Sequence, residues 1–160
     1  MKIMIAVDGS ECSEPLVDFV SRMRWPAGSR TVVVSIANAA AGMVAAPFEA
    51  AAASAEIEEL DVREHEDLVA RASQALTHAG IPCETKVILG EPASALLQAV
   101  RDEGADLLVV GSHGRTGLTK LLLGSVSAHV VGHAPCSVLV VKRAARPVGS
   151  EAPRAERTVA

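Results

Sequence analysis

The chain has 160 residues, of which 49% are hydrophobic and 21% are charged, and its formal net charge is −4 at pH 7. This length suits one domain with a core that needs neither disulfides nor a structural metal, and the negative charge, with two Phe, one Trp and no Tyr, argues against a nucleic-acid partner. No run approaches the roughly 20 apolar residues of a membrane span, and the first apolar run, at residues 3–7, is too short for a signal peptide, so we expect a cytoplasmic protein without a membrane partner.

The N-terminal half predicts two buried strands, each followed by a helix. Residues 3–7 and 31–36 are apolar and rich in β-branched side chains, as in strands buried on both faces. After the first strand, Ser13 can cap a helix that stops at residues 25–28. An alanine-rich loop over residues 37–48 leads from the second strand into a helix over about 50–78. The acidic residues of that long helix are interpreted as its solvated face. At helical spacing, the inward-facing residues are Leu16, Phe19, Val20 and Met23 in the first helix, and Ile57, Leu60, Leu68, Ala72, Ala75 and Leu76 in the second.

The C-terminal half repeats this alternation. Residues 83–89 predict a strand in a less buried, edge-like position, and a helix from Ala93 to Gly104 follows it. A short strand over 106–110, a helix over 126–131 and a last strand over 137–142 complete the pattern. We therefore expect one domain over residues 1–143, and the Ala-, Arg-, Pro- and Glu-rich residues 144–160 as a disordered tail.

Alternating strands and helices predict a three-layer α/β fold with a mainly parallel sheet. Ligands of such sheets lie beyond the carboxyl ends of the strands, where the strand order reverses. If the first and fourth strands are neighbours, residues 8–10 and 111–127 flank one crevice there.

The most informative motif is G-x2-G-x9-G-S, formed by Gly111, Gly114, Gly124 and Ser125 between the fourth strand and the next helix. Glycines leave main-chain N–H groups open to a ligand, and the positive end of a helix favours phosphate. The motif lacks the Lys-Ser or Lys-Thr of the P-loop and the G-x-G-x-x-G spacing of dinucleotide sites. A glycine turn with Ser125 as an ordinary helix cap is an equally good interpretation of these residues alone.

Other polar residues near these loops also have two interpretations each. Asp8 follows a strand directly and can accept from an adenine amino group or a ribose hydroxyl, or it can simply shape the turn before Gly9. His113 can donate to phosphate or remain an exposed loop histidine, and Arg115 can neutralise phosphate or be solvated, while Lys120 is interpreted as solvated.

Metal-ligand spacing occurs once, at His129 and His133, which lie four residues apart on a predicted helix with Cys136 close behind. No further ligand completes a motif, so we interpret both histidines as helix-surface residues and assign no metal site. Cys12, Cys83 and Cys136 form no C-x-x-C pair and fit reduced thiols.

Four segments together resemble the ATP-binding branch of the universal stress protein family: KIMIAVDGSECS, GEPASALL, VVGSHGRTGLTKLLLGSVS and HAPCSVLVVKR. The resemblance covers residues 1–143 except for the loop after the second strand, which has no clear counterpart. It implies a five-stranded parallel sheet in the order 3-2-1-4-5, similar to Rossmann and adenine nucleotide alpha-hydrolase folds, and a homodimer joined through the last strand. It also implies a nucleotide site with Asp8 near the adenine or ribose, Ile36 against the base, and the glycine loop around the ribose and phosphates. The matching residues are Ala6, Val7, Asp8, Ile36, Val110, Gly111, His113, Gly114, Gly124, Ser125, Val126 and Ser127.

The function that we expect is therefore that of an ATP-binding regulatory or stress-adaptation module with an unidentified protein partner. No catalytic residue is assigned, because neither a Ser-His-Asp order nor a paired acid and base can be identified. A slow ATPase or nucleotide-transferring enzyme that uses the same pocket is the alternative. Bound Mg²⁺ would offset phosphate charge in either case, although the sequence reveals no protein ligands for it.

Overall fold

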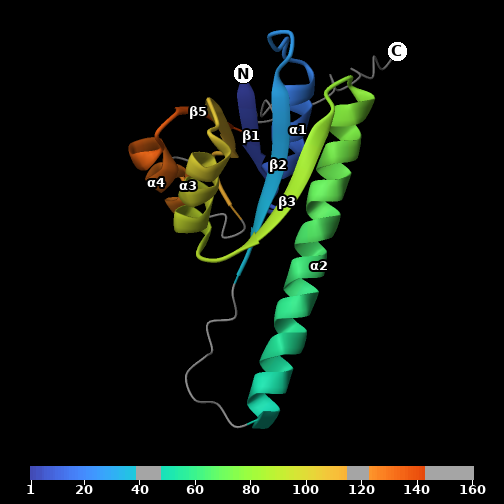
Figure 1. Cartoon of the computed structure of the whole chain (residues 1–160), viewed down its shortest axis with the longest axis vertical. Helices are drawn as coiled ribbons and strands as arrows, with labels where there is room; N and C mark the ends of the chain where they lie inside the picture. The colour runs from blue at the N-terminus through green and yellow to red at the C-terminus, as the bar shows by residue number, and fades with distance from the viewer. Residues whose placement is uncertain (39–47, 115–122, 143–160) are drawn as a thin grey trace, which may run out of the picture.

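Five parallel strands form one sheet in the order β3-β2-β1-β4-β5, as Figure 1 shows for the computed structural model of the chain. The structure describes residues 1–38, 48–114 and 123–142, with side chains from residue 58 onward in the second of these ranges. The elements in chain order are β1 (Lys2–Ala6), α1 (Ser13–Ser21), β2 (Arg30–Ala37), α2 (Phe48–His78), β3 (Cys83–Leu89), α3 (Pro92–Glu103), β4 (Leu107–Gly111), α4 (Ser125–His133) and β5 (Ser137–Val141). The predicted strand order and the edge position of residues 83–89 are confirmed.

The central strands β2, β1 and β4 are buried on both faces because alternate residues of each strand point to opposite helix layers. On one face, α1 and α2 cover Ile3, Ile5, Val33 and Val109, and on the other face α3 and α4 cover a second set of apolar strand residues. That second set is Met4, Val34, Leu108 and Val110. The three-layer α/β architecture predicted from the sequence is therefore confirmed.

The strand order reverses between β1 and β4, which are neighbours in the sheet although α1 to α3 separate them in sequence. In parallel register Ile5 pairs with both Val33 and Val109, so the carboxyl ends of β1, β2 and β4 lie at the same edge. The loops that leave these strands are consequently brought together.

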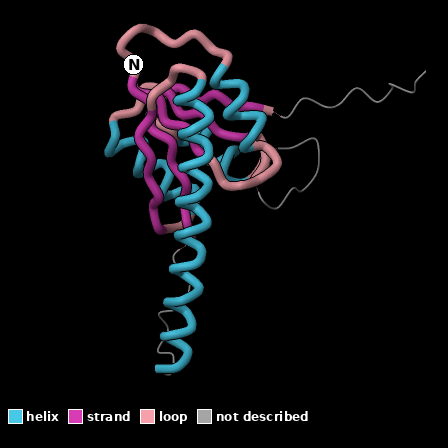
Figure 2. Tube along the Cα trace, turned by 90° about the vertical axis from the view of Figure 1, so that its right-hand side faces the viewer, coloured by secondary structure: helices cyan, strands magenta, loops and turns pink. Residues whose placement is uncertain are grey.

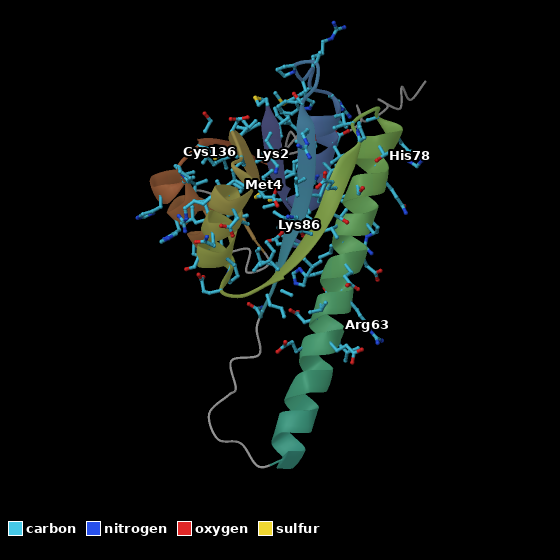
Figure 3. All side chains as sticks on the ribbon, in the orientation of Figure 1. Lys2, Met4, Arg63, His78, Lys86 and Cys136 are labelled. Carbon is cyan, nitrogen blue, oxygen red and sulfur yellow. The ribbon has the colours of Figure 1, made fainter. Side chains whose placement is uncertain are left out.

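Helix α2 runs past the end of the sheet (Figures 1 and 2). His78 lies at the end of α2 that packs beside the strands, whereas Arg63 lies near the point where the helix leaves them (Figure 3). Val69, Ala72 and Leu76 are buried, but the exposed fraction of Leu60 is 64%. The predictions that Leu60 and Ala75 face the core are wrong, because both lie on the same exposed side of the helix as Glu64 and Arg71, turned away from the buried stripe.

The start and end of α1 also differ from the prediction. The N-cap residue is Cys12, and Ser13 is the first helical residue, because its hydroxyl is engaged by Asp8 instead of capping the helix. Leu16 and Val20 are fully buried, but Phe19 is 44% exposed and Met23 lies beyond the end of the helix. Two of the four apolar residues predicted to face inward therefore lie at the surface.

Helix α3 has well-defined ends. The Glu91 carboxylate accepts from the backbone N–H groups of Ala93 and Ser94, and these contacts, that from Ser94 above all, lower the pKa of Glu91. Gly104 ends the helix with φ +57°, a left-handed conformation that favours glycine. The predicted stop at Gly104 is thus confirmed.

Glu103, in the last turn of α3, ties this helix to two strands. Its carboxylate forms ion pairs with Lys2 of β1 and Lys86 of β3. The hydrogen bonds from Lys2 and then Lys86 lower the pKa of Glu103 to about 2. The ionised carboxylate therefore contributes to the stability of the fold near neutral pH.

Parts of the prediction lie outside the described residues. These are the tail over 144–160, most of the loop over 37–48, the side chain of Ile57, and both Arg115 and Lys120. Within the described ranges no helix combines the length and apolar character needed to cross a membrane.

Candidate functional site

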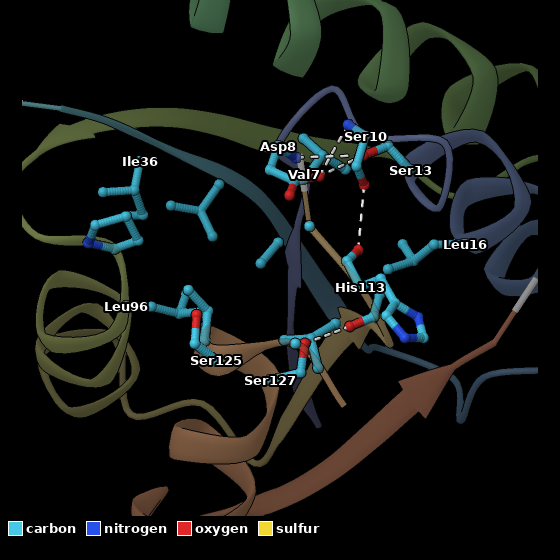
Figure 4. Close-up of a pocket in the computed structure, with 18 of the residues that line it drawn as sticks. Val7, Asp8, Ser10, Ser13, Leu16, Ile36, Leu96, His113, Ser125 and Ser127 are labelled. Carbon is cyan, nitrogen blue, oxygen red and sulfur yellow. Dashed lines mark hydrogen bonds between the residues drawn. The ribbon is translucent and has the colours of Figure 1, made fainter. Parts of the chain in front are cut away.

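A crevice of about 240 Å³ opens at the carboxyl ends of β1, β2 and β4. Figure 4 shows Asp8 and Ser125 on opposite walls, with Ile36 and Leu96 at one side and His113 at the other. The structure brings together every site residue implied by the sequence resemblance. The crevice is lined by Ala6, Val7, Asp8, Ile36, Val110, Gly111, His113, Gly114, Gly124, Ser125, Val126 and Ser127, along with further residues described below.

The glycines of the motif are required by close packing of the loop. A Cβ atom at Gly114 would lie 2.9 Å from the Asp8 Oδ2 atom, and one at Gly111 would lie 2.9 Å from the Cys12 Cβ atom. Gly124 faces backbone, with the N atom of Gly114 3.4 Å from its hypothetical Cβ. Larger side chains would therefore displace neighbouring atoms, and the bare backbone of this loop lines the crevice.

Helix α4 begins at the crevice. Its N-cap residue is Gly124, no side chain caps it, and Ser125 is its first residue. The interpretation of Ser125 as an ordinary helix cap is therefore wrong. The first N–H groups of a helix have no partner within it, so the start of α4 presents donors and the positive end of the helix dipole.

Ser127 supports the glycine loop from within α4. Its hydroxyl is buried and donates to the Gly111 carbonyl oxygen at 2.6 Å. The Gly124 N–H donates to the Ser112 carbonyl oxygen at 2.8 Å, and the Ser112 N–H donates to Val141 of β5 at 2.9 Å. Both ends of the loop are thus fixed to the sheet.

Asp8 shapes the turn after β1, as one of its two interpretations predicted. Its Oδ1 atom accepts from the Ser10 N–H at 3.0 Å and from the Ser13 hydroxyl at 3.1 Å, which shapes the turn after β1. Its Oδ2 atom packs against Gly114, 2.9 Å from the position that a Cβ atom would take there, and Asp8 and Gly114 both line the crevice. One carboxylate oxygen therefore holds the turn, while the other lies toward the glycine loop.

His113 is half-buried between the two glycines. Its Nδ1 atom lies 3.0 Å from the hydroxyl of Ser112, a contact that restricts the ring. The backbone oxygen of His113 accepts from the Ser10 hydroxyl at 3.3 Å, so the loops after β1 and β4 contact each other directly. This contact closes one side of the crevice.

Several lining residues were missed in the sequence: Ser13, Leu16, Val34, Asn38, His65, Pro92 and Leu96. His65 is the most informative of them, because it is a buried polar residue on α2 with an exposed fraction of 2%. His65, Val69, Ala72 and Leu76 follow helical spacing, so the sequence carried a signal for its inward orientation. The acidic residues around it concealed that signal.

The histidine pair on α4 lies away from this crevice. The rings of His129 and His133 stack with centroids 4.3 Å apart, and the Nδ1 atom of His133 lies 2.8 Å from the backbone oxygen of His129. Within the described ranges no group of three or more His, Cys, Asp or Glu side chains is arranged to hold a metal.

The fold and the crevice define a class of protein: a doubly wound α/β domain with a glycine-lined site where its strand order reverses. The sequence pattern of the Universal stress protein family matches residues 1–142, and the chain belongs to this family. A Thermus aquaticus relative, named "Universal stress protein in QAH/OAS sulfhydrylase 3'region", is 34% identical over 141 residues, which cover 88% of this chain and 97% of the relative.

Solved structures share the fold. Protein MJ0577, a universal stress protein of Methanocaldococcus jannaschii, superposes with a TM-score of 0.77 at 25% identity, over 89% of this chain and 95% of that one. A universal stress protein family protein from Arabidopsis thaliana, solved with AMP bound, superposes with a TM-score of 0.60 at 22% identity, over 94% of this chain and 97% of that one.

Proposed function

We propose that this chain binds ATP in the crevice between the loops after β1 and β4, and that occupancy regulates its interaction with a protein partner. The observation that carries this proposal is the convergence of the glycine loop, the start of α4 and the Asp8 carboxylate on one crevice. The AMP-bound Arabidopsis relative supports an adenine nucleotide as the ligand.

Each part of the ligand has suitable chemistry opposite it. Ile36, Leu96 and Pro92 offer an apolar side for the base, and the Asp8 carboxylate can accept from a ribose hydroxyl or the adenine amino group. The start of α4 and the glycine loop offer N–H donors to the phosphates. Mg²⁺ bound to the nucleotide would offset the remaining phosphate charge.

The decisive experiment is mass spectrometry of nucleotide released from freshly purified, denatured protein, followed by calorimetric titration of the emptied protein with ATP, ADP and AMP. Titrations with and without Mg²⁺ measure the contribution of the cation. Tighter binding of ATP than of AMP is expected, since the triphosphate adds contacts to the glycine loop. A protein that is purified empty and binds none of the three nucleotides would contradict the proposal.

The proposed homodimer is supported by the position of β5 at the edge of the sheet, where residues 138–140 are half-buried and apolar. A second copy pairing along β5 would cover this edge. Light scattering at working concentration is expected to give twice the chain mass. A monomer across the accessible concentration range would refute this part.

A further inference from the structure

Two polar residues one turn apart on α2 contact the strand ends that build one wall of the crevice. The Nδ1 atom of His65 lies 2.6 Å from the hydroxyl of Ser35 in β2, and this hydroxyl donates to the Val7 carbonyl oxygen at 2.5 Å. The Oδ2 atom of Asp61 accepts from the Asn38 N–H at 2.9 Å. Helix α2 therefore holds the residues that directly follow β1 and β2.

The direction of the hydrogen bonds follows from the number of available protons. The Ser35 hydroxyl has one proton and gives it to Val7, so it must accept from His65, which then carries its proton on Nδ1. The His65 Nε2 atom lies 3.8 Å from Asp61 Oδ1. That separation is too long for a hydrogen bond, so the hydrogen bonds run from His65 through Ser35 to the backbone of Val7, and Asp61 acts separately on Asn38.

Burying an imidazole at this position costs more free energy than burying an apolar side chain of similar volume. Val69, Ala72 and Leu76 continue the same inward stripe of α2 with apolar side chains, whereas His65 and Ser35 are both at least 98% buried and polar. Burying polar groups costs free energy unless they are hydrogen-bonded, and an apolar pair of similar volume would avoid that cost. The polar pair occurs at the level of the crevice, where Val7 and His65 both line it.

We propose that His65 and Asp61 are positioning residues for recognition of the nucleoside, an inference that rests on the proposed nucleotide binding. They act through the backbone of Val7, next to Asp8, and through Asn38, which follows the base-side residue Ile36. The phosphate side is built by different segments, the glycine loop and α4. Loss of the α2 contacts therefore weakens binding of the nucleoside and leaves binding of the phosphates unchanged.

The test compares His65→Leu, which keeps the volume and removes the donor, with His65→Asn, whose side-chain amide can donate to Ser35. Calorimetry measures the affinity of the emptied protein for ATP and, as a probe of the phosphate side alone, for inorganic tripolyphosphate. Because His65→Leu loses one buried hydrogen bond, the ATP affinity of this variant is expected to be about tenfold lower than that of the wild type. Tripolyphosphate affinity stays at the wild-type value, and His65→Asn recovers most of the ATP affinity.

A second pair of variants tests Asp61 without disturbing the core, because its side chain is 23% exposed. Asp61→Ala removes the acceptor for the Asn38 N–H, whereas Asp61→Asn retains an oxygen there. Asp61→Ala is expected to weaken ATP binding several-fold and Asp61→Asn much less. Glu66→Gln, on the solvated face of the same helix, serves as the matched control and should leave both affinities unchanged.

The outcomes separate the two proposals. Wild-type protein that binds no adenine nucleotide overturns both of them. If the wild type binds ATP and His65→Leu binds it equally well, this inference alone is overturned. It is also overturned if His65→Leu loses ATP and tripolyphosphate affinity equally and His65→Asn recovers neither. A ¹⁵N NMR spectrum that places the His65 proton on Nε2 would overturn the assigned direction of the contacts.

Discussion

Substitution of Gly114 by alanine tests the geometry of the crevice. The new Cβ atom would lie 2.9 Å from the Asp8 Oδ2 atom, closer than side-chain carbons approach other atoms. The carboxylate can turn away only by giving up its contacts with Ser10 at 3.0 Å and Ser13 at 3.1 Å. Hydrogen bonds to a charged group contribute roughly 1.5–3 kcal/mol each when buried, so for this partly exposed pair we expect a loss of about 2 kcal/mol in the free energy of unfolding.

Urea denaturation measures this loss, and Gly132→Ala is the control. Gly132 lies within α4 with no atom near its hypothetical Cβ, so alanine there should stabilise the protein by about 0.5–1 kcal/mol through helix propensity. In an Asp8→Ala background the contact is absent, and the cost of Gly114→Ala should fall below about 0.5 kcal/mol. An equal cost in both backgrounds would refute the reasoning, and so would a Gly114→Ala variant as stable as wild type.

Three further predictions concern stability. The pKa of Glu103 lies below its usual value of 4.5, so its ion pairs stabilise the fold above that pH and are lost as the pH falls toward about 2. Glu103→Gln should remove about 1 kcal/mol of pH-dependent stability after allowance for solvent screening, and acid titrations of wild type and variant with the same slope would contradict this. Leu76→Ala should lower the free energy of unfolding, measured by urea denaturation, by about 2–5 kcal/mol, because the Leu76 side chain is fully buried. Leu60→Ala on the same helix should lower it by less than about 0.5 kcal/mol, because Leu60 is exposed. Equal losses in the two variants would contradict this prediction. Glu91→Ala removes the cap of α3 and should lower the free energy of unfolding by about 1 kcal/mol, seen as a lower melting temperature. Glu91→Asp keeps a capping carboxylate and should lose less stability, whereas an equal loss in both variants would contradict the capping role.

The sheet could be predicted from the sequence because its central strands, β2, β1 and β4, are buried on both faces. Runs such as Val32–Val34 have no polar residue that would fit a helix face, and Gly104 stops α3 through backbone conformation alone. The site residues were found through the sequence resemblance, since spacing alone left a turn and a phosphate cradle equally open.

Helix faces and caps were harder to predict, for physical reasons. Apolar residues occur on more than one side of α2, and periodicity alone does not show which side packs on the sheet, so Leu60 and Ala75 were expected inside. Ser13 has the chemistry of a cap, but its hydroxyl contacts Asp8. His65 was overlooked because its partner Ser35 lies on a different element, and only the packing of α2 on β2 brings the two together.

The shortest ladder in the sheet runs beneath the crevice. Three residue pairs join β1 to β4, whereas seven join β2 to β3. A molecule that contacted both Asp8, which follows β1, and Ser125, which follows β4, would hold these two strands together where they share the fewest residue pairs. Binding of this molecule should slow hydrogen exchange of the backbone amides most in β1 and β4, so exchange rates in the centre of the sheet would measure binding at its edge.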